Sequence, residues 1–253
     1  MRKIAAALSK GGVGKTTTAV SLAAGLARAG KSVLLIDLDT QGQVTRHLGC
    51  KTAAGIAELV LGETTPEAAL VQARPNLWLL AGGRSLGGLK RQITQKDYGG
   101  ETTLSEALSP LDERFDYTIL DSAPGWDALT VNVLFYAREV IAPVSLEIMA
   151  LQGLIDFNHS LASIKKYQPE LELKYILPTF FDRRVRKSDE ILGQLVAHFG
   201  KHVCAPIRYN VRLSEAPGYG QTIFEYAPSS PGAEDYRSLT ERILLDEQTE
   251  ANS

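Results

Sequence analysis

Two lysines flank a run of glycines near the start of the chain, in the segment ALSKGGVGKTTTAV at residues 7–20. An apolar run precedes these glycines and an alanine-rich helical pattern follows them, which is the context of a phosphate-binding loop. In such a loop the backbone N–H groups surround the phosphate oxygens, the lysine before the threonine bridges the β- and γ-phosphates, and the threonine hydroxyl binds Mg²⁺. The candidate nucleotide-binding residues are therefore Gly11, Gly12, Val13, Gly14, Lys15, Thr16 and Thr17, with Thr16 also a metal ligand. Lys10 has no role in such a loop.

Three aspartates come at the ends of strand-like apolar runs. Asp37 and Asp39 lie in SVLLIDLDTQG, and Asp121 ends DYTILDS. Residues two apart on a strand share a face, and the carboxyl ends of the strands are where α/β sheets bind ligands. We expect these carboxylates to serve a magnesium ion and a hydrolytic water, with Asp121 on the metal side. A structural role for Asp37 and Asp39, capping the turn that follows, is the alternative.

The segments that must position these residues alternate between strand and helix patterns, which is typical of parallel βαβ units. We therefore predict an α/β P-loop NTPase fold, with a mostly parallel twisted sheet covered by helices on both faces. The sequence predicts a single domain over 1–246, an irregular and mobile excursion at 82–102, and a frayed acidic tail at 247–253. Strands are expected at 3–8, 32–39, 76–83, 116–125, 139–145 and 173–181, and helices at 17–30, 54–61, 101–109, 127–137, 148–167, 187–199 and 231–245.

Composition excludes several classes of protein. The net charge is −2, so any nucleic-acid surface must be a local patch. Cys50 and Cys204 are far apart in the sequence, which argues against a disulfide framework or a cysteine-built zinc site and fits a reducing compartment. No apolar stretch approaches the length of a membrane span, and the apolar run near Met1 is too short for a signal peptide. We expect a cytoplasmic protein.

The loop reads K-G-G-x-G-K-T, with Ser9 where the common form has its first glycine. This resembles the deviant phosphate loop of the ParA/MinD superfamily of ATPases. In that superfamily the extra lysine, here Lys10, reaches across a sandwich dimer to the partner's nucleotide. The resemblance therefore makes Lys10 a catalytic and ATP-binding residue together with Lys15. A second cation on the terminal phosphate would also explain why ATP holds two protomers together better than ADP.

The same resemblance assigns roles to the acidic residues. The family has a D-x-D-x-Q-G segment whose second aspartate, here Asp39, positions or activates the attacking water, and the resemblance makes Asp39 catalytic. Asp37 is expected in the outer sphere of the magnesium ion. Thr40 and Ala123 replace prolines that relatives usually carry, which should alter the stiffness of the loops more than their chemistry.

The string YNVRLSEAPGYGQTI resembles the Soj-like branch of chromosomal and plasmid partition ATPases. In the family the segment before NVRLSEAP usually reads I-P-R-N and lies near the adenine, which implies that Asn210 binds ATP. This chain reads Ile207-Arg208-Tyr209-Asn210, so the adenine contacts depart from the pattern. The resemblance implies ATP and Mg²⁺ as cofactors, an ATP-dependent homodimer, and slow hydrolysis stimulated by a ParB-like centromere-binding partner.

A basic cluster at FFDRRVRKS, together with RYNVR, suggests a nucleoid-associated, non-specific contact with double-stranded DNA through phosphates. Arg184 and Arg212 match positions that Soj-like ATPases use for DNA. Charge alone adds Arg183, Arg186 and Lys187. Two alternatives stay open: a MinD-like membrane-associated ATPase, although the acidic end of the chain fits a membrane helix poorly, and a ParA-like ATPase that positions protein clusters.

Overall fold

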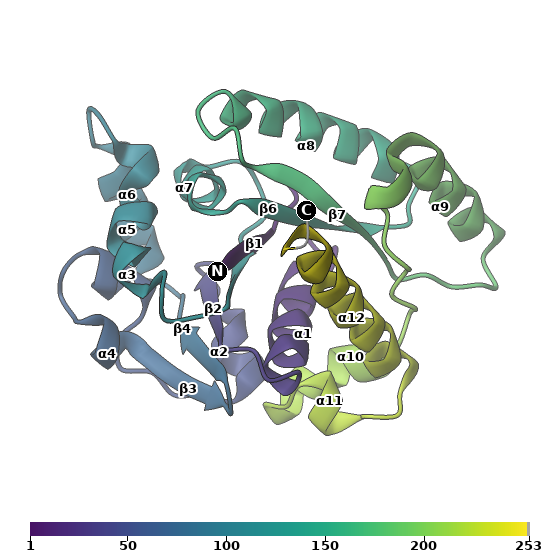
Figure 1. Ribbon diagram of the computed structural model, residues 1–253, viewed down its shortest axis with the longest axis horizontal. Coiled ribbons are helices and arrows are strands. Elements are labelled where there is room, and N and C mark those ends of the chain that lie inside the picture. Colours follow the sequence, from purple (N-terminus) through teal and green to yellow (C-terminus); the bar gives the residue numbers. More distant parts are fainter. Residues whose placement is uncertain (252–253) are drawn as a thin grey trace.

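The computed structural model describes residues 1–251. Its centre is a seven-stranded sheet in the order β3-β4-β2-β5-β1-β6-β7, and every neighbouring pair is parallel except β3 with β4. Figure 1 shows the sheet between two layers of helices. The predicted α/β P-loop fold is confirmed. The strands are β1 (Arg2–Ala6), β2 (Val33–Leu38), β3 (Leu70–Arg74), β4 (Leu77–Leu80), β5 (Tyr117–Ser122), β6 (Glu139–Ser145) and β7 (Glu172–Thr179).

The central strands are buried on both faces, which explains their continuous apolar sequences. In β2 every residue is buried, and successive side chains enter two different hydrophobic cores. Leu34 and Ile36 belong to one core, whereas Val33 and Leu35 belong to the other. Alternation along an extended chain thus divides a uniformly apolar strand between the two helical layers.

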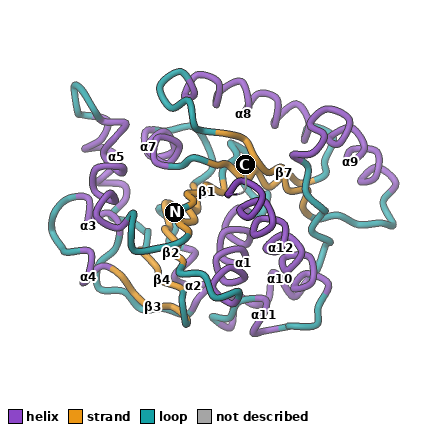
Figure 2. Tube along the Cα trace, in the orientation of Figure 1, coloured by secondary structure: helices purple, strands orange, loops and turns teal. Residues whose placement is uncertain are grey.

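One core contains α1 and α12, and the other contains the helices around α7 and α8 (Figure 2). The helix α1 is rich in alanine and lies against α12 so closely that a Cβ at Gly25 would meet the Thr240 hydroxyl. The longer helices are α1 (Lys15–Arg28), α5 (Leu86–Thr94), α7 (Ala128–Tyr136), α8 (Ala150–Lys165), α9 (Arg186–Phe199) and α12 (Pro231–Ala251). The shorter ones are α2 (Gln43–Leu48), α3 (Ile56–Val60), α4 (Pro66–Ala69), α6 (Thr103–Leu108), α10 (Val211–Glu215) and α11 (Ile223–Tyr226).

Several elements were not expected, namely the edge strand β3 and the helices α2, α4, α5, α10 and α11. The edge strand β3 pairs antiparallel with β4, at a position where no strand was expected. The segment expected as an irregular excursion at 82–102 contains α5, and its residues Leu86, Leu89 and Ile93 are buried at helical spacing. The expectation of irregular structure is wrong for that part of 82–102.

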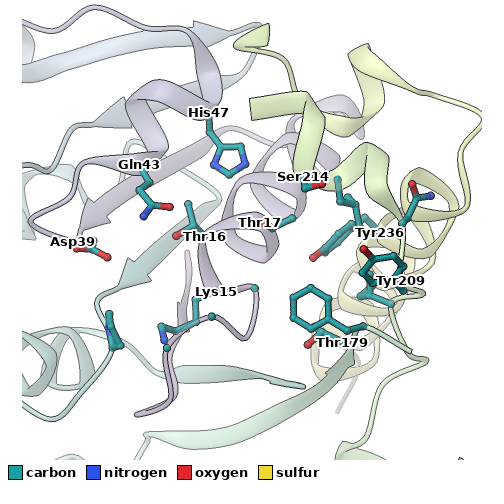
Figure 3. Close-up of a pocket in the computed structure, with 18 of the residues that line it drawn as sticks. Lys15, Thr16, Thr17, Asp39, Gln43, His47, Thr179, Tyr209, Ser214 and Tyr236 are labelled. Carbon is teal, nitrogen blue, oxygen red and sulfur yellow. The ribbon is translucent and has the colours of Figure 1, made fainter. Parts of the chain in front are cut away.

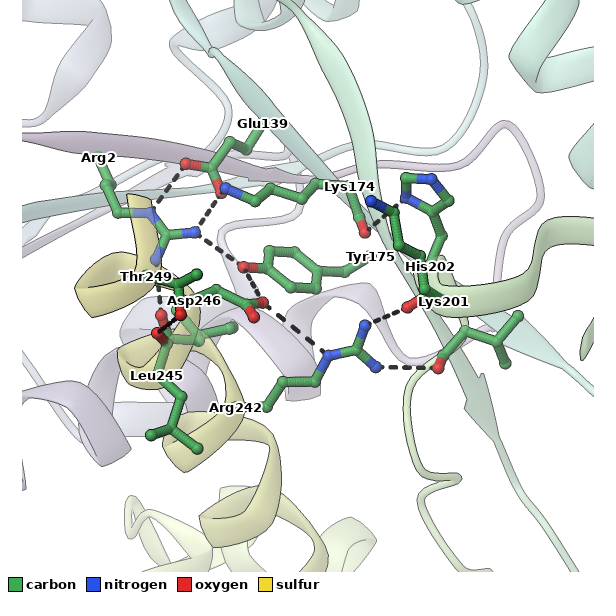
Figure 4. A network of polar contacts seen from close by, with 12 residues as sticks. Arg2, Glu139, Lys174, Tyr175, Lys201, His202, Arg242, Leu245, Asp246 and Thr249 are labelled. Atoms are coloured by element: carbon green, nitrogen blue, oxygen red, sulfur yellow. Dashed lines mark hydrogen bonds and ion pairs between the residues drawn. The ribbon is translucent and has the colours of Figure 1, made fainter. Parts of the chain in front are cut away.

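The last helix is longer than the 231–245 predicted, because α12 continues to Ala251. Residues 247–251, which were expected to form a frayed tail, are helical, and Glu247 pairs with Lys31 at 2.9 Å. Residues 252–253 lie outside the part of the chain that the structure describes. A polar network also ties α12 to the sheet (Figure 4): Arg2 donates to Glu139 and to the Tyr175 hydroxyl, which donates to Asp246. The division at residue 246 stays a prediction.

The sheet order places a topological switch point beside β1, because the chain leaves β1 towards β2 on one side and reaches β6 on the other. Ligands bind α/β sheets at the carboxyl ends of strands near such a point. The glycine loop after β1, Asp39 after β2 and Asp121 in β5 meet at this edge. Among residues 1–251, no helix is long and apolar enough to cross a membrane.

Candidate nucleotide-binding site

The glycine loop curls around the amino end of α1. Gly12 and Gly14 have φ angles of +72° and +91°. Residues with a side chain rarely adopt this backbone conformation, which explains glycine at these positions. Lys15 is the first residue of α1, and its Nζ donates to the carbonyls of Lys10 at 2.7 Å and of Leu8 at 3.1 Å. Burial lowers the pKa of Lys15, and the carboxylates of Asp121 and Asp39 act in the opposite direction. A nearly buried cation thus lies beneath the glycine loop, held by two backbone carbonyls.

A cavity of about 440 Å³ opens above this loop (Figure 3). Most of the predicted nucleotide-binding residues line it: Gly11, Gly12, Gly14, Lys15, Thr16, Thr17 and Asn210. Asp39, predicted to be catalytic, lines it as well. Val13 does not line it, because its side chain is buried in the core and its carbonyl accepts a hydrogen bond from Thr179. The loop, the start of α1 and the segment before α10 therefore form one concave site, although they are far apart in the sequence.

Asp121 offers a test of whether the site fits a magnesium ion. Its carboxylate is fully buried, and neither oxygen has a hydrogen-bond partner among the described residues. Burial raises the pKa of Asp121, the charge of Asp37 raises it further, and the nearby Thr16 hydroxyl, which stays outside hydrogen-bonding geometry, lowers it. A buried carboxylate without partners is costly unless a cation completes it. Asp121 and Thr16 thus fit Mg²⁺.

The rest of the site suits magnesium rather than a metal held wholly by protein. No group of three histidine, cysteine or acidic residues among residues 1–251 could hold a metal ion by itself. Mg²⁺ needs no such group, because it keeps several waters and is bound through one or two carboxylates together with phosphate oxygens. When bound, the ion would neutralise charge on the terminal phosphates.

Asp37 and Asp39 play different parts, although they share a face. Both Asp37 oxygens accept backbone N–H groups, from Asp39 at 3.0 Å and Val44 at 3.2 Å, and burial raises the pKa of Asp37 to about 6. Asp37 therefore holds the turn after β2, and its place in the outer sphere of a magnesium ion stays a prediction. Asp39 is partly exposed and faces the cavity (Figure 3). A carboxylate there can orient a water.

Several cavity residues escaped the sequence reasoning. His47 and Gln43 come from α2, and burial lowers the pKa of His47 to about 4, so it is neutral in the free protein. Phe180, Tyr209 and Tyr236 also line the cavity, and Figure 3 shows Tyr209 and Tyr236 on the side away from Asp39. Aromatic and histidine residues are ordinary core components, so composition alone gave no signal for them.

Lys10 takes a different direction from Lys15. Its Nζ pairs with Glu147 at 2.5 Å, the side chain is 47% exposed, and it does not line the nucleotide cavity. It lines a separate hollow of about 340 Å³ between the loop and α8. The two lysines of the loop therefore separate, one under the cavity and one on the outer surface.

The basic segments 180–187 and 207–212 lie side by side. Phe181 and Arg208 form a parallel bridge, and the Tyr209 N–H donates to Phe181 O at 2.8 Å. Arg183, Arg184, Arg186, Lys187 and Arg212 are all exposed. Three of these five cations pair with nearby carboxylates, in the pairs Arg184–Asp182, Arg186–Glu190 and Arg212–Glu215. Among residues 1–251, no ion pair is found for Arg183 or Lys187. The surface is thus less positive than the run of basic letters suggests.

Comparison with known proteins decides the family. A family model described as an AAA domain matches residues 1–173. The chromosome-partitioning ATPase Soj of Thermus thermophilus is 43% identical over 246 residues, which are 96% of this chain and 96% of Soj. The chain belongs to the ParA/Soj family of partition ATPases. The chromosome partitioning protein ParA of Myxococcus xanthus is 35% identical, over 93% of this chain and 85% of that relative.

Solved structures agree with a nucleotide site. A Mycobacterium smegmatis protein with bound ATP analogue and magnesium is 33% identical, with a TM-score of 0.82, over 96% of this chain and 94% of the other. That protein is described as a cobyrinic acid a,c-diamide synthase. MinD of Pyrococcus horikoshii, bound to Mg-ADP, is 20% identical with a TM-score of 0.79 and shares the fold. This partition ATPase is an ATP hydrolase whose cofactors are ATP and Mg²⁺.

Proposed function

We propose that this ParA/Soj-family ATPase forms a homodimer around two ATP molecules, binds double-stranded DNA without sequence preference, and segregates a chromosome or plasmid with a ParB-like partner. It would work in the cytoplasm, associated with the nucleoid. ATP would assemble the dimer and hydrolysis would dissolve it. DNA binding would follow this cycle, because a dimer doubles the number of phosphate contacts.

The divergence of the two loop lysines carries the proposal. Lys15 is buried beneath the cavity and can serve only the nucleotide of its own protomer. Lys10 has an exposed ammonium group outside that cavity, so its charge is available to another molecule. Its partner Glu147 is exposed as well, and such surface pairs contribute little, about 0–1 kcal/mol. Lys10 can therefore leave Glu147 for the phosphate of a facing protomer at small cost.

The two segments that would contact DNA also form one wall of the nucleotide cavity. Phe180 and Tyr209 line that cavity, whereas Arg183 and Arg184 follow Phe180 by three and four residues and Arg212 follows Tyr209 by three. This proximity supports a DNA surface that responds to nucleotide state. Asp39, which faces the cavity, would position the attacking water, and the ParB-like partner would accelerate that slow step.

The test is binding to random-sequence duplex DNA with ATP, with ADP and without nucleotide, over a series of salt concentrations. We expect salt-sensitive binding with ATP only, lost in Arg184→Glu. Equal binding with ATP and ADP would contradict the nucleotide switch. If the protein still dimerises but binds no DNA, the dimer must instead bind lipid or a protein cargo.

The membrane alternative is weakened by the last helix. The apolar residues of α12, among them Ala233, Tyr236, Leu239 and Ile243, are buried in the core against α1. A membrane-binding helix needs a free apolar face with basic flanks. This helix exposes acidic residues such as Glu234 and Glu241 instead.

A further inference from the structure

The carboxylate of Asp39 has one oxygen engaged and one free. Its Oδ1 accepts the Gln41 N–H at 2.9 Å, whereas no hydrogen bond to its Oδ2 is found among residues 1–251. Asp39 lines the nucleotide cavity, so the free oxygen can accept a hydrogen bond from a water there. A water held by one hydrogen bond can still rotate about it, and attack on phosphorus requires an aligned lone pair. A second acceptor near Asp39 would fix that direction.

Gln43 offers such an acceptor at the start of α2. Its side chain is exposed and lines the same cavity, and Figure 3 shows it on the same side of that cavity as Asp39. No hydrogen bond of the Gln43 amide is found within the part of the chain that the structure describes. The amide carbonyl accepts hydrogen bonds without carrying a charge, so it adds no repulsion beside Asp39 and the terminal phosphate. The Gln43 carbonyl is therefore available to a water.

One buried carboxylate fixes the backbone at both residues. Asp37, which is fully buried, accepts the Asp39 N–H at 3.0 Å through Oδ1 and the Val44 N–H at 3.2 Å through Oδ2. Between them Gly42 turns the chain with a φ angle of +60°, and its N–H donates to Asp39 O at 3.0 Å. The turn therefore holds Asp39 and Gln43 in a fixed relation at the edge of the cavity, although four positions separate them in the sequence.

We propose that Gln43 is a second catalytic residue for ATP hydrolysis: its side-chain carbonyl accepts one hydrogen bond from the attacking water while Asp39 Oδ2 accepts the other. The water oxygen then forms a bond to the γ-phosphorus, and the bond from that phosphorus to the β–γ bridging oxygen breaks, with its electron pair leaving on ADP. One proton of the water passes through Asp39 to solvent, and the other stays on the phosphate. Gln43 remains neutral throughout. The inference rests on the proposed role of Asp39 and not on dimerisation or DNA.

The experiment measures the dissociation constant of MgATP and the rate of its hydrolysis in a single turnover, without DNA or a partner protein. Gln43→Met keeps the length of the side chain and removes the carbonyl. It should hydrolyse ATP about ten-fold more slowly, the effect of losing one hydrogen bond in the transition state, and bind MgATP as the wild type does. The double variant Asp39→Ala, Gln43→Met should be about as slow as Asp39→Ala alone, because side chains that hold one water do not contribute independently.

Gln92→Met is the matched control, because Gln92 is exposed on α5 and lies outside the cavity, and it should change neither the rate nor the dissociation constant. An unchanged rate in Gln43→Met, beside a slow Asp39→Ala, would overturn the role of Gln43 alone. Weaker MgATP binding in Gln43→Met would also overturn it, since Gln43 would then hold the nucleotide itself. A further ten-fold loss in the double variant would overturn the shared water. An unchanged rate in Asp39→Ala would instead refute the proposed role of Asp39, and with it this inference.

Discussion

A substitution at Asp182 tests whether the basic segments bind DNA, because Asp182 neutralises Arg184, which the family resemblance places on DNA. The Arg184 guanidinium makes two hydrogen bonds to Asp182, Nε to Oδ1 at 3.0 Å and Nη2 to Oδ2 at 2.7 Å. DNA phosphate must compete with this carboxylate for the same donors. Asp182→Asn removes the competing charge, so we expect tighter binding and greater sensitivity to salt.

The magnitude follows from counterion release, in which each neutralised phosphate adds about 0.9 to the slope of log K against log salt. If only the unpaired Arg183 and Lys187 reach phosphates, the slope is about 2 per protomer. If all five cations do so, it is about 4.5 per protomer, and a dimer doubles each value. Asp182→Asn should steepen the slope by about 1 per protomer, and Arg184→Glu should make it shallower.

The assay is fluorescence anisotropy of a labelled random duplex with the ATP-bound protein, titrated with KCl. Glu63→Gln removes an exposed carboxylate far from the two basic segments in sequence, and so controls for net charge. If the Glu63 variant changes the slope as much as the Asp182 variant does, overall charge and not this surface determines binding. A slope near zero would refute phosphate recognition altogether.

Two further substitutions test the nucleotide site, and a third tests stability. Lys15→Ala should abolish ATP binding, measured by calorimetry, and normal affinity would exclude the site described here. Asp39→Ala should bind ATP yet hydrolyse it at least a hundred-fold more slowly, since orienting the water is a large part of phosphoryl transfer; unchanged phosphate release would remove Asp39 from the mechanism. Asp37→Asn concerns stability. The folded pKa of Asp37, about 6, lies above the ordinary 3.8, so its contribution is present at low pH and lost as pH rises through 6. That loss is about 3 kcal/mol at about 1.4 kcal/mol per pKa unit, and the variant should show a flatter pH dependence in urea unfolding between pH 4 and 7.

The fold could be predicted from the sequence because each central strand is a short apolar run between loops and helices. The edge strand β3 was missed because its sequence, LVQAR, is only partly buried and carries little apolar signal. For α5 the signal was present: Leu86, Leu89 and Ile93 have helical spacing, but Gly87 and Gly88 beside them suggested a loop. Glycine lowers helix propensity without forbidding a helix whose apolar face is buried.

The residues of the nucleotide site could be predicted from the sequence only in part. The glycine loop was evident because its chemistry is local, and Asp121 because it ends a strand. Phe180, Tyr209 and His47 come from segments that only the fold brings together, so their spacing in the sequence does not indicate a shared site. The basic cluster was overestimated for a similar reason. The carboxylates that pair with Arg186 and Arg212 lie four and three residues further along helices, where such residues are neighbours on one face. Counting only the basic residues of the cluster leaves these carboxylates out.

The most direct test of the account is the mass of the protein in solution with MgATP, measured by light scattering. Asp39→Ala should retain ATP and give a dimer, whereas the double variant Asp39→Ala, Lys10→Ala should bind ATP with similar affinity and stay a monomer. A dimer that forms without Lys10 would contradict the central claim that this lysine joins two protomers through the nucleotide.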